Sequence, residues 1–197
     1  MNVLIIDTGC ANLASLRHAL QRLGIDPAVS ADPAAIAAAD KLLLPGVGTA
    51  RAAMDNLHDR GLIAAIQNAT QPLLGICLGL QLLTDHSAEG DLATLGLIPG
   101  ATVPLPAAGL PLPHMGWNRV SADRDSPLFA DIPPDSYFYF VHSYGVLDSP
   151  ATIARCDYGG PFAAALGRGK RYGVQFHPER SGAAGARLLH NFIYNCP

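Results

Sequence analysis

A cysteine flanked by two glycines lies within the otherwise apolar run 73–83. Residues 75–79 read GICLG, which is the pattern G-x-C-x-G, between a strand-like and a helix-like stretch. This order is typical of a nucleophile elbow, a sharp turn that holds a reactive side chain at the carboxyl edge of a sheet. Free N–H groups at the helix start, including that of Leu78, favour a thiolate at Cys77 and can stabilise an oxyanion. Taken alone, the pattern fits equally a buried structural cysteine between two packing glycines.

A nucleophilic cysteine needs a base, and the chain contains seven histidines. His177 ends the strand-like stretch YGVQF, and Pro178 after it favours an extended backbone. In an extended chain residues i and i+2 project to the same side, so the Glu179 carboxylate can approach the imidazole of His177 and fix its tautomer. The alternative is a strand-end histidine in a surface turn beside a solvated glutamate. His114 and His142 remain possible bases, whereas helical or surface positions are expected for His18, His58, His86 and His190.

A glycine turn follows another buried strand, in the segment LPGVGTA at 44–50. The residues Gly46, Val47 and Gly48 let the backbone approach a ligand and expose N–H groups to it. One of these, together with the N–H of Leu78, could receive the negative oxygen of a tetrahedral intermediate. The turn is no phosphate loop, because no G-K-[ST] follows it. The sequence also shows no dense group of histidine, cysteine and carboxylate side chains, so we expect no metal and no cofactor.

The composition indicates a globular chain. Of its 197 residues 49% are hydrophobic and 15% are charged, the formal net charge is −3, and no run of Lys and Arg occurs. We therefore expect one domain spanning residues 1–197, with no nucleic-acid surface. No apolar run reaches the roughly 18 residues of a membrane span, and no secretory signal is visible. The irregular spacing of Cys10, Cys77, Cys156 and Cys196 predicts reduced thiols in the cytoplasm.

The hydrophobic pattern predicts an α/β fold, with a mostly parallel central sheet covered by helices on both faces. In the second half it predicts a smaller, partly antiparallel sheet region after an irregular, proline-rich crossing. The expected strands are 2–6, 27–29, one within 41–48 that runs into the glycine turn, 72–76, 137–144, 151–156, 162–166 and 171–176. The expected helices are 13–23, 33–39, 49–57, 62–69, 78–86 and 183–194, and the crossing is 99–113.

Four motifs stand in order along the chain: PGVG, GICLGLQ, HMGWN and HPERSG. With them the chain resembles the class I, triad-type glutamine amidotransferases. The resemblance runs essentially from end to end and is closer to the glutaminase subunits of imidazole glycerol phosphate synthase, which act in histidine biosynthesis. The cysteine elbow and H-P-E are typical of the superfamily, whereas PGVG, HMGWN and YFVHSY favour this subfamily.

The resemblance implies a Cys77–His177–Glu179 triad that hydrolyses L-glutamine to glutamate and ammonia through a cysteinyl thioester. His177 would act first as base and then as the acid for the departing ammonia, and Glu179 would orient it. The implied contacts to the substrate or its oxyanion are the Gln81 side chain and backbone groups of Gly46, Val47, Gly48, Ser143 and Tyr144.

The resemblance also implies a protein partner, a (β/α)8-barrel cyclase subunit in a heterodimer. It would receive the ammonia and form imidazole glycerol phosphate and an aminoimidazole carboxamide ribotide. Met115, Trp117 and Asn118 match a segment that the family places near that interface, although a single tryptophan is as readily a buried core residue. Arg180 stands where many relatives carry lysine, which changes the geometry of any ion pair with the partner. The opening DTGCAN also departs from the commoner pattern and puts Cys10 near the sheet edge.

Three other functions stay open at the level of sequence. The first is an amidotransferase of another pathway, for anthranilate, aminodeoxychorismate, guanylate or pyridoxal phosphate, because these share the triad. The second is a non-catalytic regulatory subunit on the same fold, which loss of a triad residue would indicate. The third is an unrelated thiol hydrolase. All three triad positions are filled here, and the subfamily motifs argue against the first alternative.

Overall fold

The computed structural model describes residues 1–9, 12–123 and 125–197. Its centre is one eight-stranded sheet in the order β2-β1-β3-β4-β14-β13-β12-β9. Neighbouring strands are parallel from β2 to β14 and antiparallel from β14 to β9. The strands are β1 (Val3–Ile6), β2 (Ala28–Ser30), β3 (Lys41–Gly46), β4 (Leu73–Cys77), β9 (Ser121–Ala122), β12 (Thr152–Asp157), β13 (Pro161–Arg168) and β14 (Arg171–Val174).

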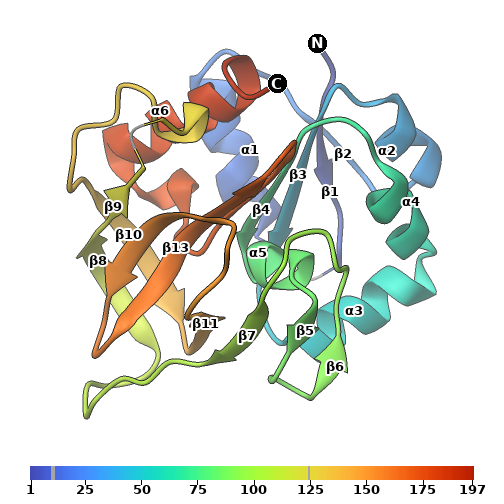
Figure 1. Cartoon of the computed structure of the whole chain (residues 1–197). Helices are drawn as coiled ribbons and strands as arrows, with labels where there is room; N and C mark the ends of the chain where they lie inside the picture. The colour runs from blue at the N-terminus through green and yellow to red at the C-terminus, as the bar shows by residue number, and fades with distance from the viewer. Residues whose placement is uncertain (10–11, 124) are drawn as a thin grey trace.

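Helices cover both faces of this sheet (Figure 1). On one face lie α1 (Leu13–Arg22) and α6 (Gly182–Tyr194); on the other lie α2 (Pro33–Ala38), α3 (Ala50–Asp59), α4 (Leu62–Asn68) and α5 (Leu78–Leu83). The side chain of Asn12 accepts a hydrogen bond from the Ser15 N–H and so caps the start of α1. Two short 3-10 helices, η1 (Pro127–Phe129) and η2 (Pro178–Arg180), complete the helical part of the described chain.

The two faces form two separate hydrophobic cores. Along β1, Val3 and Ile5 belong to the core under α1 and α6, whereas Leu4 and Ile6 belong to the core under the other helices. This division follows from the two-residue period of a strand, and it explains why a strand covered on both faces reads as an uninterrupted apolar run. The expected α/β class is therefore confirmed.

Two small sheets lie beside the main one. A two-stranded antiparallel sheet joins β8 (His114–Arg119) to β10 (Tyr137–His142), and a four-stranded sheet has the order β11-β7-β5-β6. Its strands are β5 (His86–Ser87), β6 (Leu92–Ala93), β7 (Ala101–Pro104) and β11 (Tyr144–Val146). No helix in the described ranges has both the length and the apolar character that crossing a membrane requires.

Several local predictions are wrong. The helix expected at 78–86 ends at Leu83, and His86 lies in β5, because the chain turns into the small sheet as soon as the short apolar helix is buried. The crossing 99–113 contains β7, and 114–119 forms β8, which pairs with β10 over its whole length. Short strands with mixed side chains lack a clear periodicity, so only their pairing reveals them. The expected smaller, partly antiparallel sheet region is present as the two small sheets, while β12, β13 and β14 belong to the main sheet. The Cys10 prediction lies outside the described residues.

Candidate active site

The elbow at Cys77 depends on two close backbone approaches. Cys77 ends β4 with φ 56° and ψ −111°, a strained conformation for a residue with a side chain, and α5 starts at the next residue. A Cβ at Gly75 would lie 2.6 Å from the carbonyl oxygen of Gly79, and a Cβ at Gly79 would overlap the carbonyl oxygen of Leu44. Both glycines are therefore required for strand and helix to meet at this angle. A purely structural cysteine would need neither the strain nor the glycines.

The turn that carries His177 is held by β10, by the hydroxyl of Ser181 and by the packing of α6. The N–H of His177 donates to the carbonyl of Tyr139 at 2.9 Å, and the Ser181 hydroxyl donates to the carbonyl of His177 at 2.6 Å. Helix α6 also packs tightly on the turn, because a Cβ at Gly185 would overlap the Pro178 carbonyl oxygen. The position of His177 thus depends on segments that are distant in the sequence.

The imidazole of His177 is braced by Glu179, as the sequence predicts. Nδ1 of His177 lies 2.9 Å from Oε1 of Glu179, and both side chains are less than a tenth exposed. Burial opposes protonation of the ring, but the nearby Cys77 sulfur and the hydrogen-bonded Glu179 carboxylate outweigh it and raise the pKa of His177 to about 10. Nε2 is buried and makes no hydrogen bond within the described residues, so it is available for proton transfer.

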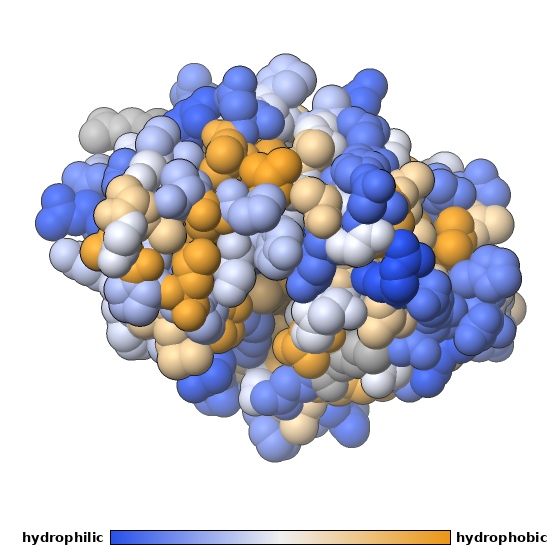
Figure 2. Space-filling model, turned by 90° about the horizontal axis from the view of Figure 1, so that it is seen from below, coloured by the Kyte–Doolittle hydropathy of each residue, from blue (hydrophilic) through white to orange (hydrophobic). Residues whose placement is uncertain are grey.

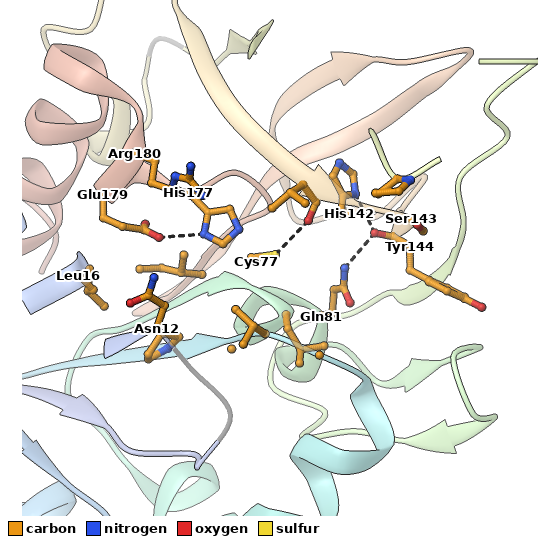
Figure 3. A pocket seen from close by; sticks show the side chains of 18 of the residues that line it. Asn12, Leu16, Cys77, Gln81, His142, Ser143, Tyr144, His177, Glu179 and Arg180 are labelled. Carbon is orange, nitrogen blue, oxygen red and sulfur yellow. Dashed lines mark hydrogen bonds and ion pairs between the residues drawn. The ribbon is translucent and has the colours of Figure 1, made fainter. Parts of the chain in front are cut away.

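The triad lines one cavity of about 420 Å³ (Figure 3). The close-up shows the His177 ring above Cys77, with Glu179 on its far side and with Gln81 and Tyr144 on the opposite side of the sulfur. In Figure 2 the molecule is turned to be seen from below, and the surface is hollowed near its centre. All the predicted substrate and oxyanion residues line the cavity: Gly46, Val47, Gly48, Leu78, Gln81, Ser143 and Tyr144.

The register of the sheet explains how the glycine turn reaches the elbow. Gly46 pairs with Cys77 across the parallel strands β3 and β4, so the turn that follows β3 lies beside the sulfur. A Cβ at Gly46 would approach the Leu78 Cβ to 3.0 Å, and Gly48 has a φ of +93°. The turn therefore uses its glycines for close packing and for a left-handed bend.

Two polar residues of the site were not identified from the sequence. Gln175 is fully buried, its amide lies 3.8 Å from Sγ of Cys77, and its Oε1 accepts a hydrogen bond from Gln81 at 3.1 Å. Its place two residues before His177, on the same side of an extended chain, could have indicated it. Glu89 lines the cavity and accepts a hydrogen bond from the Ala50 N–H at 2.8 Å. It lies in an irregular segment between short strands, and no local pattern marks it.

Two of the residues expected at a partner interface, Trp117 and Arg180, lie around the same ring, that of Tyr139, at the side of the cavity. Trp117 is 55% exposed and Met115 is 63% exposed, so the alternative of a buried core tryptophan is wrong. Asn118 is half-buried, and its amide is engaged inside the chain. Arg180 borders the cavity and places its guanidinium 4.5 Å from the ring centre of Tyr139.

Among the described residues no group of three or more His, Cys, Asp or Glu side chains could hold a metal ion.

Comparison with known proteins assigns the family. The class-I glutamine amidotransferase family matches residues 4–196. The imidazole glycerol phosphate synthase subunit HisH of Mannheimia succiniciproducens is 63% identical over 193 residues, which cover 98% of this chain and 100% of that protein. The HisH subunit of Escherichia coli K12 is 56% identical over 194 residues, covering 98% and 99%.

Solved structures show the same fold at low sequence identity. A glutamine amidotransferase crystal structure has a TM-score of 0.77 at 16% identity and covers 98% of this chain and 97% of that one. The structure of PurLQS from Thermotoga maritima has a TM-score of 0.72 at 19% identity, covering 100% and 99%. The family expected from the four sequence motifs is thereby confirmed: the chain belongs to the class-I glutamine amidotransferases and, among them, to the HisH subunits of imidazole glycerol phosphate synthase.

Proposed function

We propose that this chain hydrolyses L-glutamine to glutamate and ammonia, with Cys77 as nucleophile, His177 as the proton-transfer group and Glu179 as its orienting partner. The observation that carries the proposal is the buried ion pair between His177 and Glu179 beside a cysteine on a strained elbow. A protonated imidazole stabilises negative charge on a neighbouring sulfur, which is the form that attacks a carbonyl carbon. The cavity beside the sulfur supplies the space for a small substrate.

The first half of the reaction ends in a thioester. The Cys77 sulfur attacks the side-chain amide carbon of glutamine, and the amide oxygen becomes negatively charged. We assign the N–H of Leu78 and an N–H from the turn 46–48 to that oxygen, because both segments line the cavity beside Cys77. The proton on Nε2 of His177 passes to the leaving nitrogen, the C–N bond breaks, and ammonia departs.

The second half of the reaction restores the thiolate. Neutral His177 takes a proton from a water molecule, whose oxygen attacks the thioester carbon. The C–S bond then breaks, and glutamate leaves. Glu179 does not accept the proton in this sequence; its role is to hold Nδ1 and to stabilise the imidazolium.

Recognition of glutamine requires groups for its ammonium and its carboxylate. Apart from Glu179, which is paired with His177, Glu89 is the carboxylate among the cavity residues, and we assign it to the substrate ammonium. Backbone groups of Ser143 and Tyr144 are assigned to the substrate carboxylate or the oxyanion. Gln81 supports this site indirectly, because its amide donates to the Tyr144 carbonyl at 2.9 Å.

The chain acts together with a cyclase subunit in our proposal, because the related proteins are named as subunits of imidazole glycerol phosphate synthase. The (β/α)8-barrel partner would take the ammonia to form imidazole glycerol phosphate and the aminoimidazole carboxamide ribotide. The proposed contact residues are the exposed Met115 and Trp117 on β8 and Arg180 at the cavity rim.

Residues 1–197 act as one amidotransferase domain, since both cores pack on the same sheet. Free thiols at three described cysteines suit a cytoplasmic protein.

The test is glutamate release from glutamine, measured with and without the cyclase subunit. We expect Cys77→Ala and His177→Ala to abolish turnover while circular dichroism shows a folded chain. Cys156→Ala is the matched control, because this cysteine is buried in β12 away from the cavity residues, and it should retain activity. Turnover retained by either triad variant would reject the assignment.

A further inference from the structure

The carbonyl of Tyr144, at the edge of the substrate cavity, accepts two hydrogen bonds from side chains. Nδ1 of His142 lies 2.8 Å from this oxygen, and the amide nitrogen of Gln81 lies 2.9 Å from it. A carbonyl oxygen has two lone pairs, so both are occupied. The Leu105 N–H next to β7 donates to the carbonyl of Ser143, the residue before Tyr144. In an antiparallel pair the peptide groups alternate in direction, so the N–H and C=O of Tyr144 point away from β7.

The hydrogen bond from His142 is the last in a series of hydrogen bonds between side chains, which is called the hydrogen-bond chain below. Nε2 of His142 lies 3.1 Å from Nδ1 of His114, and Nε2 of His114 lies 3.3 Å from the amide nitrogen of Asn118. The amide orientation of Asn118 is fixed, because its oxygen accepts from the Arg119 N–H at 2.8 Å and its nitrogen donates to the Asp157 carbonyl at 2.9 Å.

The two ends of this chain fix every proton along it. The Tyr144 carbonyl can only accept, so Nδ1 of His142 carries a proton; the Asn118 amide nitrogen can only donate, so Nε2 of His114 carries none. One proton must lie between the two rings, and it belongs to Nδ1 of His114 if both rings are neutral. The direction of donation is therefore Asn118 to His114 to His142 to Tyr144.

The surroundings keep both rings uncharged. His114 stacks between Phe140 and Tyr158, at ring-centre distances of 4.9 and 4.0 Å, and both histidines are less than a tenth exposed. Burial lowers the pKa of His114 to about 4 and is the main cause that lowers the pKa of His142 to about 4. Both ring nitrogens of His142 are engaged, one by His114 and the other by the Tyr144 carbonyl. His142 is therefore not a second base for Cys77, and its fixed tautomer holds the Tyr144 carbonyl in place.

We propose that His114 and His142, with Asn118, are positioning residues that lock the Tyr144 peptide, so that the Tyr144 carbonyl is held in its own hydrogen bonds and cannot turn toward the substrate. This arrangement suits an anionic group of the substrate, because an unoccupied carbonyl there would repel a carboxylate. The proposal deepens the glutaminase function and rests on it for the identity of the substrate. The chain of hydrogen bonds itself does not depend on that function.

The first test is the tautomer of each ring, measured by long-range ¹H–¹⁵N NMR on the full chain without glutamine at neutral pH. Signals are assigned with the single variants His114→Asn and His142→Phe. We expect both residues as neutral Nδ1–H tautomers, although a histidine side chain in water prefers the Nε2–H form. An Nε2–H tautomer or an imidazolium at either residue would overturn the proposed chain, whether or not the protein hydrolyses glutamine.

The isosteric variant Asn118→Asp tests the direction of the chain. A carboxylate accepts where the amide donated, so Nε2 of His114 should gain a proton in the NMR spectrum, whereas Asn195→Asp on the surface should leave it unchanged. An unchanged His114 in Asn118→Asp would contradict the assigned direction.

The kinetic test separates positioning from catalysis. His142→Phe preserves ring volume but removes the donor to Tyr144, and we expect KM for glutamine to rise about tenfold with a smaller change in kcat. His142→Asn retains a donor nitrogen near the position of Nδ1 and should restore part of this loss. An unchanged KM in a folded, active His142→Phe enzyme would overturn the positioning role. If the wild-type chain failed to hydrolyse glutamine, the proposed function would fail while the tautomer result still stood.

Discussion

The backbone of Gly79 in α5 lies directly against the carbonyl oxygen of Leu44 in β3, with no room for a side chain between them. This contact joins the helix after the nucleophile to the strand before the glycine turn. It brings two segments more than thirty residues apart to the same side of Cys77. The geometry of the proposed oxyanion site therefore depends on a residue that takes no part in the reaction.

Substitution of Gly79 by alanine should be strongly destabilising. The added Cβ would overlap the Leu44 carbonyl, and relief requires a backbone shift in a fully buried region. We expect a loss of about 3 kcal/mol or more in the free energy of unfolding, measured by urea denaturation. Gly109→Ala is the control, because position 109 has a positive φ but open space around it, and should lose about 1–2 kcal/mol. Equal losses would show that crowding at Gly79 is unimportant.

The charge on His177 should control the reactivity of Cys77. Because the pKa of His177 is raised to about 10, the ring stays protonated through the neutral range and loses its proton only at higher pH. We expect alkylation by iodoacetamide at pH 7 to be at least about tenfold faster in the wild type than in His177→Gln. The difference should shrink as the pH rises toward 10, where an ordinary thiol is ionised as well. Equal rates at pH 7 would contradict an imidazolium beside the sulfur.

The substitution Glu179→Gln should slow the reaction but leave substrate binding nearly unchanged. The amide preserves the shape of the side chain but removes the charge that stabilises the imidazolium and fixes its tautomer. We expect kcat for glutamine hydrolysis to fall by about 10²–10⁴, with a much smaller change in KM. Asp157→Asn, at the exposed end of β12, should leave kcat unchanged. A fall of less than about fivefold in Glu179→Gln would reject an orienting role.

The substitution Glu89→Gln should weaken substrate binding. Glutamine at this position can still accept the hydrogen bond from the Ala50 N–H, so the start of α3 is retained, but the ion pair with the substrate ammonium is lost. We expect KM for glutamine to rise about tenfold or more. Asp91→Asn, which removes a nearby and almost fully exposed carboxylate, should not change KM. Similar KM values in all three proteins would exclude Glu89 from substrate recognition.

Trp117→Ala should affect the partner and not the fold. The side chain is more than half exposed, so its removal should change the free energy of unfolding by less than about 0.5 kcal/mol. If Trp117 anchors the cyclase subunit, the loss of binding free energy should be about 2 kcal/mol or more, measured by titration calorimetry. Tyr194→Ala, at an exposed aromatic residue on α6, should bind normally. Normal binding by Trp117→Ala would remove this residue from the interface.

The amino-acid sequence alone determined the fold class and the candidate triad. Apolar runs bounded by glycine and proline gave the order of strands and helices, because local periodicity is a property of neighbouring residues. G-x-C-x-G and H-P-E are equally local, since an elbow and an i, i+2 pair each need only a few residues. The full-length resemblance then supplied the family, which the comparisons confirm.

Only the tertiary structure decided what surrounds the triad. Strand β8 is found through its pairing with β10, and the approach of α5 to β3 comes from the packing of the sheet. The site also depends on hydrogen bonds between residues that are distant in sequence. These are the contacts of Gln175 and Glu89 and the series of hydrogen bonds from Asn118 to Tyr144. A hydrogen bond between such segments leaves no local pattern, because either residue type is also common at unrelated positions. The exposure of Trp117 was likewise decided by which face of the small sheet turned toward solvent.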